Sequence, residues 1–209
     1  MRAFLFILFI LFSVSAHAEG ESSERKWRFG GGLYHSFADT LTFGEAQFNN
    51  MTYKSKYKLE RAWGLQLEAD YTAPRAWGVQ VGLMIDGQRK IESMENSGAM
   101  TGSARFTNSA IDLRTLYVSA VYKWEHFYIP LGMNVTGGII SNPPVALSSV
   151  TGGVGAQLGF GWEFSPHVGI EALLRAMSLR GKSTNDGPNT YESRAGFMSG
   201  WQFSLKAYF

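Results

Sequence analysis

Apolar and polar residues alternate along most of the chain. The alternation is clearest at the C-terminal end, where the apolar set is Phe197, Trp201, Phe203, Leu205, Ala207 and Phe209. A period of two is that of a β-strand, whose successive side chains point to opposite faces. A face rich in large aromatic residues is typical of strands that meet lipid. We therefore predict a final strand with one face exposed to a membrane.

Seven further segments alternate in the same way, each over about ten residues, which is the span of a tilted strand across a bilayer. They cover residues 27–34, 59–71, 77–86, 110–124, 127–136, 153–164 and 168–175. In segment 110–124 the apolar positions change parity, from Ile111 and Leu113 to Leu116 and Val118. This change predicts a β-bulge near Arg114 or a strand boundary there. Together with the C-terminal strand, the pattern predicts eight strands.

The connections between these segments differ in length. Those near residues 73, 125 and 166 are tight turns, whereas those at 38–56, 87–109, 141–149 and 181–192 are longer and polar. Short periplasmic turns and long outward loops are typical of even-stranded outer-membrane barrels. The pattern therefore predicts an all-β fold, an eight-stranded antiparallel up-and-down transmembrane β-barrel, with both termini on the periplasmic side.

A soluble eight-stranded barrel is the structural alternative. Aromatic residues make up 14% of the chain, and there are 24 glycines. A soluble barrel turns its apolar face inward, and this aromatic face would then have to fill a lumen too narrow for it. Composition therefore favours the membrane barrel.

The first residues have the features of a secretory signal peptide. A basic Arg2 precedes an apolar stretch at residues 3–14, and small residues surround His17 at the cleavage spacing, which predicts cleavage after Ala18. Residues 19–209 would then form a single barrel domain. The chain has no cysteine, and its 19 Lys and Arg residues nearly balance 17 Asp and Glu residues, so nothing indicates disulfides or a nucleic-acid partner.

The signal peptide, the eight segments and the terminal aromatic pattern resemble the small OmpA/OmpX/OmpW-like barrels of the Gram-negative outer membrane. The resemblance covers nearly all of residues 19–209. We expect a monomer without a cofactor, in contact with outer-membrane lipid and lipopolysaccharide. The resemblance implies that the outer-membrane assembly machinery recognises the C-terminal strand through Trp201, Phe203, Leu205, Ala207 and Phe209.

Charged residues occur at inward positions of the predicted strands. Charges in a narrow lumen must be paired, because an unpaired buried charge costs several kcal/mol. We therefore expect an ion-paired network, which either fills the lumen as a structural core or rearranges as a gate that passes ions. Its predicted members are Arg28, Glu68, Asp70, Glu163, Glu171, Arg175 and Lys206.

The long connections carry apolar residues that could contact a surface partner. Lys54, Lys56 and Lys58 follow several of them and could meet lipopolysaccharide phosphates. Alternatively, these are solvated loops that pack on one another. The predicted extracellular contact residues are Phe43, Phe48, Met51, Tyr53, Met94, Met100 and Phe106.

Catalytic and metal sites are not indicated by the sequence. His35, His126 and His167 fall in a strand end and two separate turns, so we expect no metal site. His35, Ser36 and Asp39 have the residue types of a hydrolase, but the region where a related lipid A deacylase carries its His-x-Ser pair has Ser178 and no histidine. We expect a non-enzymatic protein with a structural or surface-interaction role. The alternatives are a narrow pore or a conduit for small hydrophobic molecules and, third, a lipid A-modifying enzyme.

Overall fold

The computed structural model describes residues 26–48, 51–72, 76–99, 101–144, 147, 149–182 and 194–209. These residues form one antiparallel sheet of twelve strands. The predicted signal peptide lies outside them. The strands are β1 (Lys26–Ser36), β2 (Thr40–Phe48), β3 (Met51–Leu59), β4 (Ala62–Thr72), β5 (Ala76–Asp86), β6 (Arg89–Gly98), β7 (Gly102–Arg105), β8 (Ala110–Trp124), β9 (Phe127–Ser141), β10 (Ser149–Ser165), β11 (Val168–Lys182) and β12 (Arg194–Tyr208).

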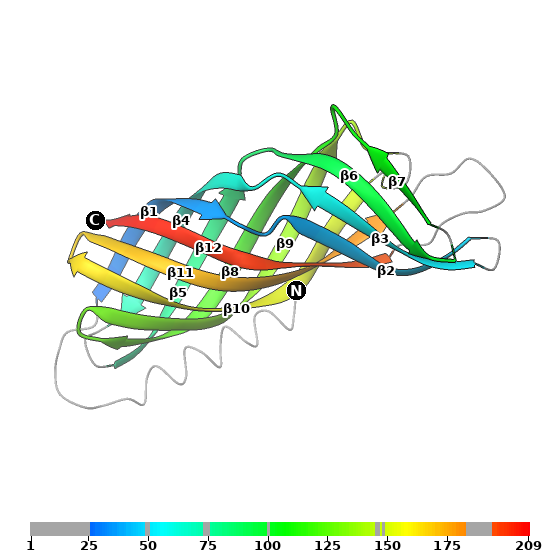
Figure 1. The fold of residues 1–209 in the computed structure, drawn as a ribbon. Helices are drawn as coiled ribbons and strands as arrows, with labels where there is room; N and C mark the ends of the chain where they lie inside the picture. Colours follow the sequence, from blue (N-terminus) through cyan, green and yellow to red (C-terminus); the bar gives the residue numbers. More distant parts are fainter. Residues whose placement is uncertain are drawn as a thin grey trace.

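Eight of these strands close into a ring (Figure 1). The order is β1-β4-β5-β8-β9-β10-β11-β12, and β12 pairs back with β1 from Gly30 opposite Tyr208 to Ser36 opposite Gln202. The predicted all-β antiparallel barrel is therefore confirmed. Closure leaves neither of these two strands with an unpaired edge along this stretch.

The predicted loops at 38–56 and 87–109 are wrong, because most of these residues are strands. β12 pairs with β2, β2 with β3, β3 with β6, and β6 with β8. Strands β2, β3 and β6 thus continue the wall beyond the ends of β1, β4 and β5. Short interruptions at 37–39, 60–61 and 87–88 separate the two parts of each strand. We call β2, β3, β6 and β7 the extension.

The inward parity of the wall changes at these interruptions. In β1 and β4 the buried residues are even-numbered, as at Tyr34 and Gln66, whereas in β2 and β3 they are odd-numbered, as at Phe43 and Tyr57. Backbone hydrogen bonds span the interruptions: the Phe37 amide donates to Trp201 at 2.8 Å. The strand pairing therefore continues across each interruption, while the inward positions change from even-numbered to odd-numbered residues. This change lets the ring turn its polar residues inward and the extension its apolar residues.

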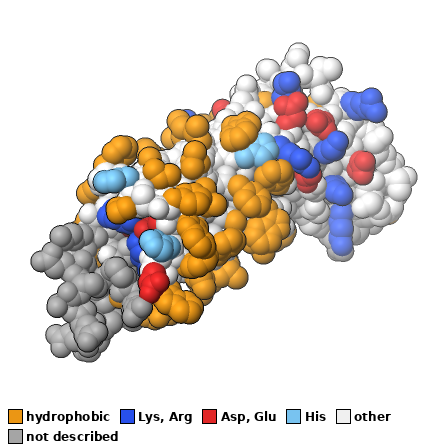
Figure 2. Space-filling view, turned by 60° about the vertical axis from the view of Figure 1, so that its left-hand side comes forward, with side chains coloured by type: hydrophobic (Ala, Val, Ile, Leu, Met, Phe, Trp, Pro, Cys, Tyr) orange, Lys and Arg blue, Asp and Glu red, His pale blue; other side chains and the backbone are white. Residues whose placement is uncertain are grey.

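The two parts of the barrel have opposite polarity. Around the eight-stranded ring the outward residues are apolar and exposed, as at Leu67 (58%) and Leu205 (58%), and the inward residues are largely polar. In the extension, the inward residues include Leu41 and Leu59, whereas Lys56 faces outward. Figure 2 shows this division as a dense hydrophobic surface on one part and scattered charged side chains on the other. The ring is suited to lipid and the extension to water.

The predicted bulge near Arg114 is absent. Strand β8 pairs with β5 and β9 without a register shift, and its odd-numbered residues point inward throughout. Ile111 and Leu113 are buried inside the barrel, whereas Leu116 faces lipid with 55% exposure. The apolar parity changes because the surroundings of the strand change from water to lipid.

In the described part of the chain, no helix is long and apolar enough to span a bilayer.

Candidate functional site

The barrel interior holds the largest concentration of charged and polar side chains. At the end of the ring that holds Phe209, Arg28 on β1 contacts two carboxylates, Glu163 at 2.6 Å and Asp70 at 3.4 Å. Lys123 on β8 forms a second ion pair with Glu163. Lys123 was not among the predicted lumen residues. Its odd number, shared with the inward Ile111 and Leu113, would have indicated it once β8 was taken as one uninterrupted strand.

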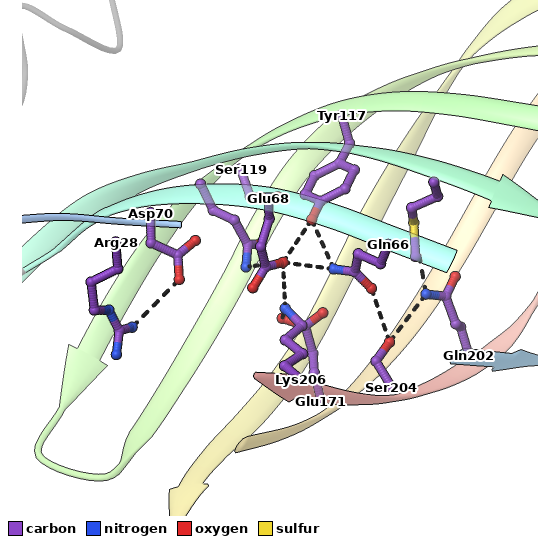
Figure 3. Close-up of polar contacts among 12 residues, drawn as sticks. Arg28, Gln66, Glu68, Asp70, Tyr117, Ser119, Glu171, Gln202, Ser204 and Lys206 are labelled. Atoms are coloured by element: carbon purple, nitrogen blue, oxygen red, sulfur yellow. Dashed lines mark hydrogen bonds and ion pairs between the residues drawn. The ribbon is translucent and has the colours of Figure 1, made fainter. Parts of the chain in front are cut away.

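A second group lies at the middle of the ring (Figure 3). The Lys206 ammonium is 2.8 Å from both Glu68 and Glu171, and all three side chains are almost completely buried. The same Glu68 oxygen accepts hydrogen bonds from Tyr117 and Gln66 at 2.8 and 2.7 Å. One carboxylate thus joins residues of β4, β8 and β12. Glu68 and Lys206 are among the predicted lumen residues, but Tyr117 is not.

Arg175 stands apart from the other predicted charges. Its guanidinium contacts the Met84 sulfur and lies 6.0 Å from the centre of the Tyr117 ring. Within the described residues, no carboxylate lies at ion-pair distance from Arg175. The predicted network is therefore divided: Arg28, Asp70 and Glu163 form one group, and Glu68, Glu171 and Lys206 form another.

A third polar group lies at the end of the ring nearest the extension, where the polar part of the interior ends. Arg89 donates to Asp86 at 2.7 Å and to the carbonyl of Ala38, and Tyr34 also bonds Asp86. Arg89 is only 1% exposed. Sequence analysis missed Arg89 because it assigned this residue to a polar loop, where an arginine would be solvated.

On the extension side of Arg89, the interior of the barrel is apolar. The residues of this apolar cluster are each at most 6% exposed, so they pack against one another rather than lining an open channel. The cluster consists of Ala38, Leu41, Phe43, Tyr57, Leu59, Ile91, Ile111, Leu113, Leu147, Val150, Met177, Leu179 and Met198.

Among the predicted extracellular contact residues, the four whose side chains are described are not fully exposed. Phe43 and Tyr53 are buried inside the extension, and Met94 and Phe106 pack against the apolar cluster. The prediction of exposed contacts is wrong for Phe43 and Tyr53 because both lie at inward positions of strands. The side chains of Phe48 and Met51, and residue Met100, lie outside the described residues.

The outer face of the extension carries lysines instead. Lys54, Lys56 and Lys58 are exposed along β3. Lys58 lies 2.8 Å from Glu92. The hydrogen bond and the charge of Glu92 raise the pKa of Lys58. Lys58 therefore remains charged in neutral solution.

The C-terminal strand presents its predicted residues to the lipid side. Trp201, Phe203, Leu205 and Phe209 are between 51% and 88% exposed. Ala207 is also exposed. The Phe209 amide donates to the Phe29 carbonyl at 2.8 Å, so the terminus is fixed at the seam of the ring. Recognition of these residues during assembly stays a prediction.

The possible hydrolase residues do not form a site. His35 and Ser36 are neighbours on one strand and point to opposite faces, with Ser36 buried in the interior. A base and a nucleophile must lie within hydrogen-bond reach of each other. His126 and His167 lie in the β8–β9 and β10–β11 turns, away from His35 at the other end of the ring.

Solved structures of outer-membrane proteins share this fold, among them the following two. The outer-membrane protein OprG of Pseudomonas aeruginosa matches with a TM-score of 0.59 at 14% identity, over 88% of this chain and 95% of that one. The outer-membrane protein AlkL matches with a TM-score of 0.53 at 12% identity, over 92% and 95%. No protein-family model and no curated protein sequence matches the chain.

These similarities define the class of protein that the fold represents. The chain has the fold of the small outer-membrane β-barrels, as the sequence resemblance predicted. The expected location in the Gram-negative outer membrane agrees with the outer-membrane nature of both structures.

Proposed function

We propose that the protein is a closed, non-enzymatic outer-membrane barrel that presents its extension as a rigid extracellular surface for contact with lipopolysaccharide. The observation that carries the proposal is the filled interior. The polar groups around Arg28, Lys206 and Arg89 follow one another inside the barrel, from one end of the ring to the other. The apolar cluster fills the interior on the extension side of Arg89.

Ion passage through this interior would be costly. An ion would have to separate buried pairs such as Lys206 and Glu68, and removing one partner of a buried pair costs about 3–5 kcal/mol. It would then have to cross an apolar cluster that offers no ligand to replace its water. The structure therefore favours the filled core over the gate.

Contact with lipopolysaccharide would use the outer face of β3. Lys54, Lys56 and Lys58 recur at every second residue and so lie in a row, exposed to solvent. Ammonium groups bind phosphate as point charges, and a row of three would face the phosphorylated core of neighbouring glycolipids. The extension places this row beyond the lipid-facing ring.

Binding of purified lipopolysaccharide to the nanodisc-embedded protein tests this surface. We expect replacement of Lys54, Lys56 and Lys58 by Gln to weaken binding at low salt by more than tenfold, because each lost charge pair contributes about 1 kcal/mol near a charged surface. Replacement of the exposed Arg114 by Gln is the matched control and should have a smaller effect. Equal affinity of the triple variant and the native protein would contradict the proposal.

A conduit for small hydrophobic molecules is the second candidate, favoured by the apolar interior of the extension. Uptake of a small apolar dye by proteoliposomes distinguishes the two functions. The closed barrel predicts the uptake rate of protein-free liposomes. Faster uptake that is abolished by Leu113→Trp would establish the conduit.

The remaining alternative is modification of lipid A. Mass spectrometry of lipid A from cells with and without the protein tests it. We expect an unchanged acyl pattern, because Ser36 and His35 do not face each other. A protein-dependent change in acyl number would overturn the non-enzymatic proposal.

A further inference from the structure

A groove of about 480 Å³ lies on the lipid-facing side of the wall, across β1, β12 and β11. Ala172 is at its floor. In the register of the sheet this alanine stands between Phe160 on β10 and Phe203 on β12. The two phenylalanines are more than half exposed, whereas Ala172 is 9% exposed although it points outward. A small residue flanked by two large ones therefore creates a notch in the outer surface.

Most of the groove lining is apolar, but one polar group stands out. His35 lines the groove, and its Nδ1 is buried without a hydrogen-bond partner within the described structure. The ring is held between Phe37 and Trp63, with ring centres 4.5 and 4.6 Å apart. An unpartnered polar atom in an apolar environment costs about 1–3 kcal/mol. A rotation of the imidazole that turns Nδ1 into the groove would let a hydroxyl or ester oxygen of a ligand satisfy it.

A positive charge lies on the water side of His35. Arg61 is exposed, and its guanidinium is 5.1 Å from the centre of the Phe37 ring, which in turn contacts His35. A cation, a hydrogen-bonding imidazole and an apolar groove thus follow one another from the extension towards the middle of the ring. This order matches an amphiphile with an anionic head, an oxygen near the head and a hydrocarbon chain.

We propose that the groove binds one acyl chain of lipid A, the phosphorylated glycolipid of the outer leaflet. The chain lies over Ala172 between Phe160 and Phe203, His35 hydrogen-bonds an oxygen near the head of that chain, and Arg61 faces a lipid A phosphate. The inference rests on the proposed function only in placing the extension on the extracellular side. A volume of this size is typical of small-ligand sites.

Native mass spectrometry of the protein released from nanodiscs containing lipid A and phosphatidylethanolamine tests the site. Ala172→Phe fills the notch and should lower lipid A retention by about tenfold, because the chain loses its buried apolar contact. Ala120→Phe, on β8 at the opposite side of the ring, is the matched control and should retain lipid A as the native protein does. The heat-dependent gel shift verifies that both variants fold.

His35→Phe separates the polar contact from the groove itself. It keeps an aromatic ring against Phe37 and Trp63 but removes Nδ1, and should lower lipid A retention by about fivefold, the effect of one hydrogen bond. Retention of lipid A by Ala172→Phe and His35→Phe at the native level would overturn the site, as would preferential retention of phosphatidylethanolamine by the native protein. The variant with Lys54, Lys56 and Lys58 replaced by Gln should retain lipid A as the native protein does. A failure of the proposed lipopolysaccharide contact and a failure of the proposed acyl-chain site therefore give different results.

Discussion

The Lys206 ammonium lies 2.8 Å from a Glu68 oxygen, and both side chains are 1% exposed. The two residues belong to β12 and β4, which are separated in the ring by β1. The ion pair therefore connects the last strand to the first half of the chain over the inner face of β1. Its environment suggests a direct test of how the interior contributes to stability.

Replacement of Lys206 by Met should strongly destabilise the barrel. It leaves Glu68 and Glu171 buried without their cation, and an unpaired buried charge costs about 3–5 kcal/mol. Urea unfolding in lipid vesicles, followed by tryptophan fluorescence, measures the loss. The matched control is the triple variant Glu68→Gln, Glu171→Gln and Lys206→Met, which should recover most of the stability. A single variant as stable as the native barrel would show that the charges are solvated.

The apolar cluster of the extension should be sensitive to cavities. Leu113→Ala removes a buried side chain and should lower the free energy of unfolding by about 2–5 kcal/mol. Leu116→Ala, three residues further along β8 but facing lipid, should cost less because no internal cavity forms. The same urea titration compares the two. Equal losses would indicate that the extension is not packed as described.

Close packing of the wall around Gly132 predicts an effect of a single methyl group. A Cβ atom at this position would lie 2.2 Å from the Val118 carbonyl oxygen, so Gly132→Ala should destabilise by about 1–3 kcal/mol through overpacking. On the same strand, a Cβ at Gly137 would meet nothing within 4 Å. Gly137→Ala should therefore be neutral or stabilise by up to about 1 kcal/mol. The order of their unfolding midpoints checks the prediction.

The C-terminal aromatic residue should affect assembly more than stability. Phe209→Ala removes the residue that the resemblance assigns to recognition, and we expect less folded barrel in the outer membrane of cells. Phe197→Ala removes an exposed aromatic from the same face of β12 and is the matched control. The heat-modifiable fraction on a detergent gel measures both. Equal folded fractions would show that the terminal position carries no recognition.

The membrane-spanning ring could be predicted because lipid imposes one pattern on every strand. Residues such as Leu67 and Leu205 must be apolar, and a period of two follows directly. The extension obeys the opposite rule, with Leu41 inside and Lys56 outside. The sequence therefore predicts polar loops in place of these strands, since their outer face has the composition of a loop and their inward face changes parity at the interruptions.

The candidate site was predicted as a set of inward charges but not as distinct groups. Strand parity places Glu68 and Lys206 inside, because parity depends only on position along a strand. Their pairing depends on which strands are neighbours and on the stagger between them, which only the closed ring determines. Arg89 could not be found in this way because its strand lies beyond an interruption, where the inward parity is reversed.

Single-channel recording in planar lipid bilayers tests most directly whether the interior is closed. The filled interior predicts no reproducible conductance for the native protein or for Lys206→Ala, because the apolar cluster still fills the barrel when the Lys206–Glu68 pair is lost. Reproducible conductance steps of the native protein that are altered by Glu68→Ala or Lys206→Ala would show that ions pass through the lumen and would contradict the closed barrel.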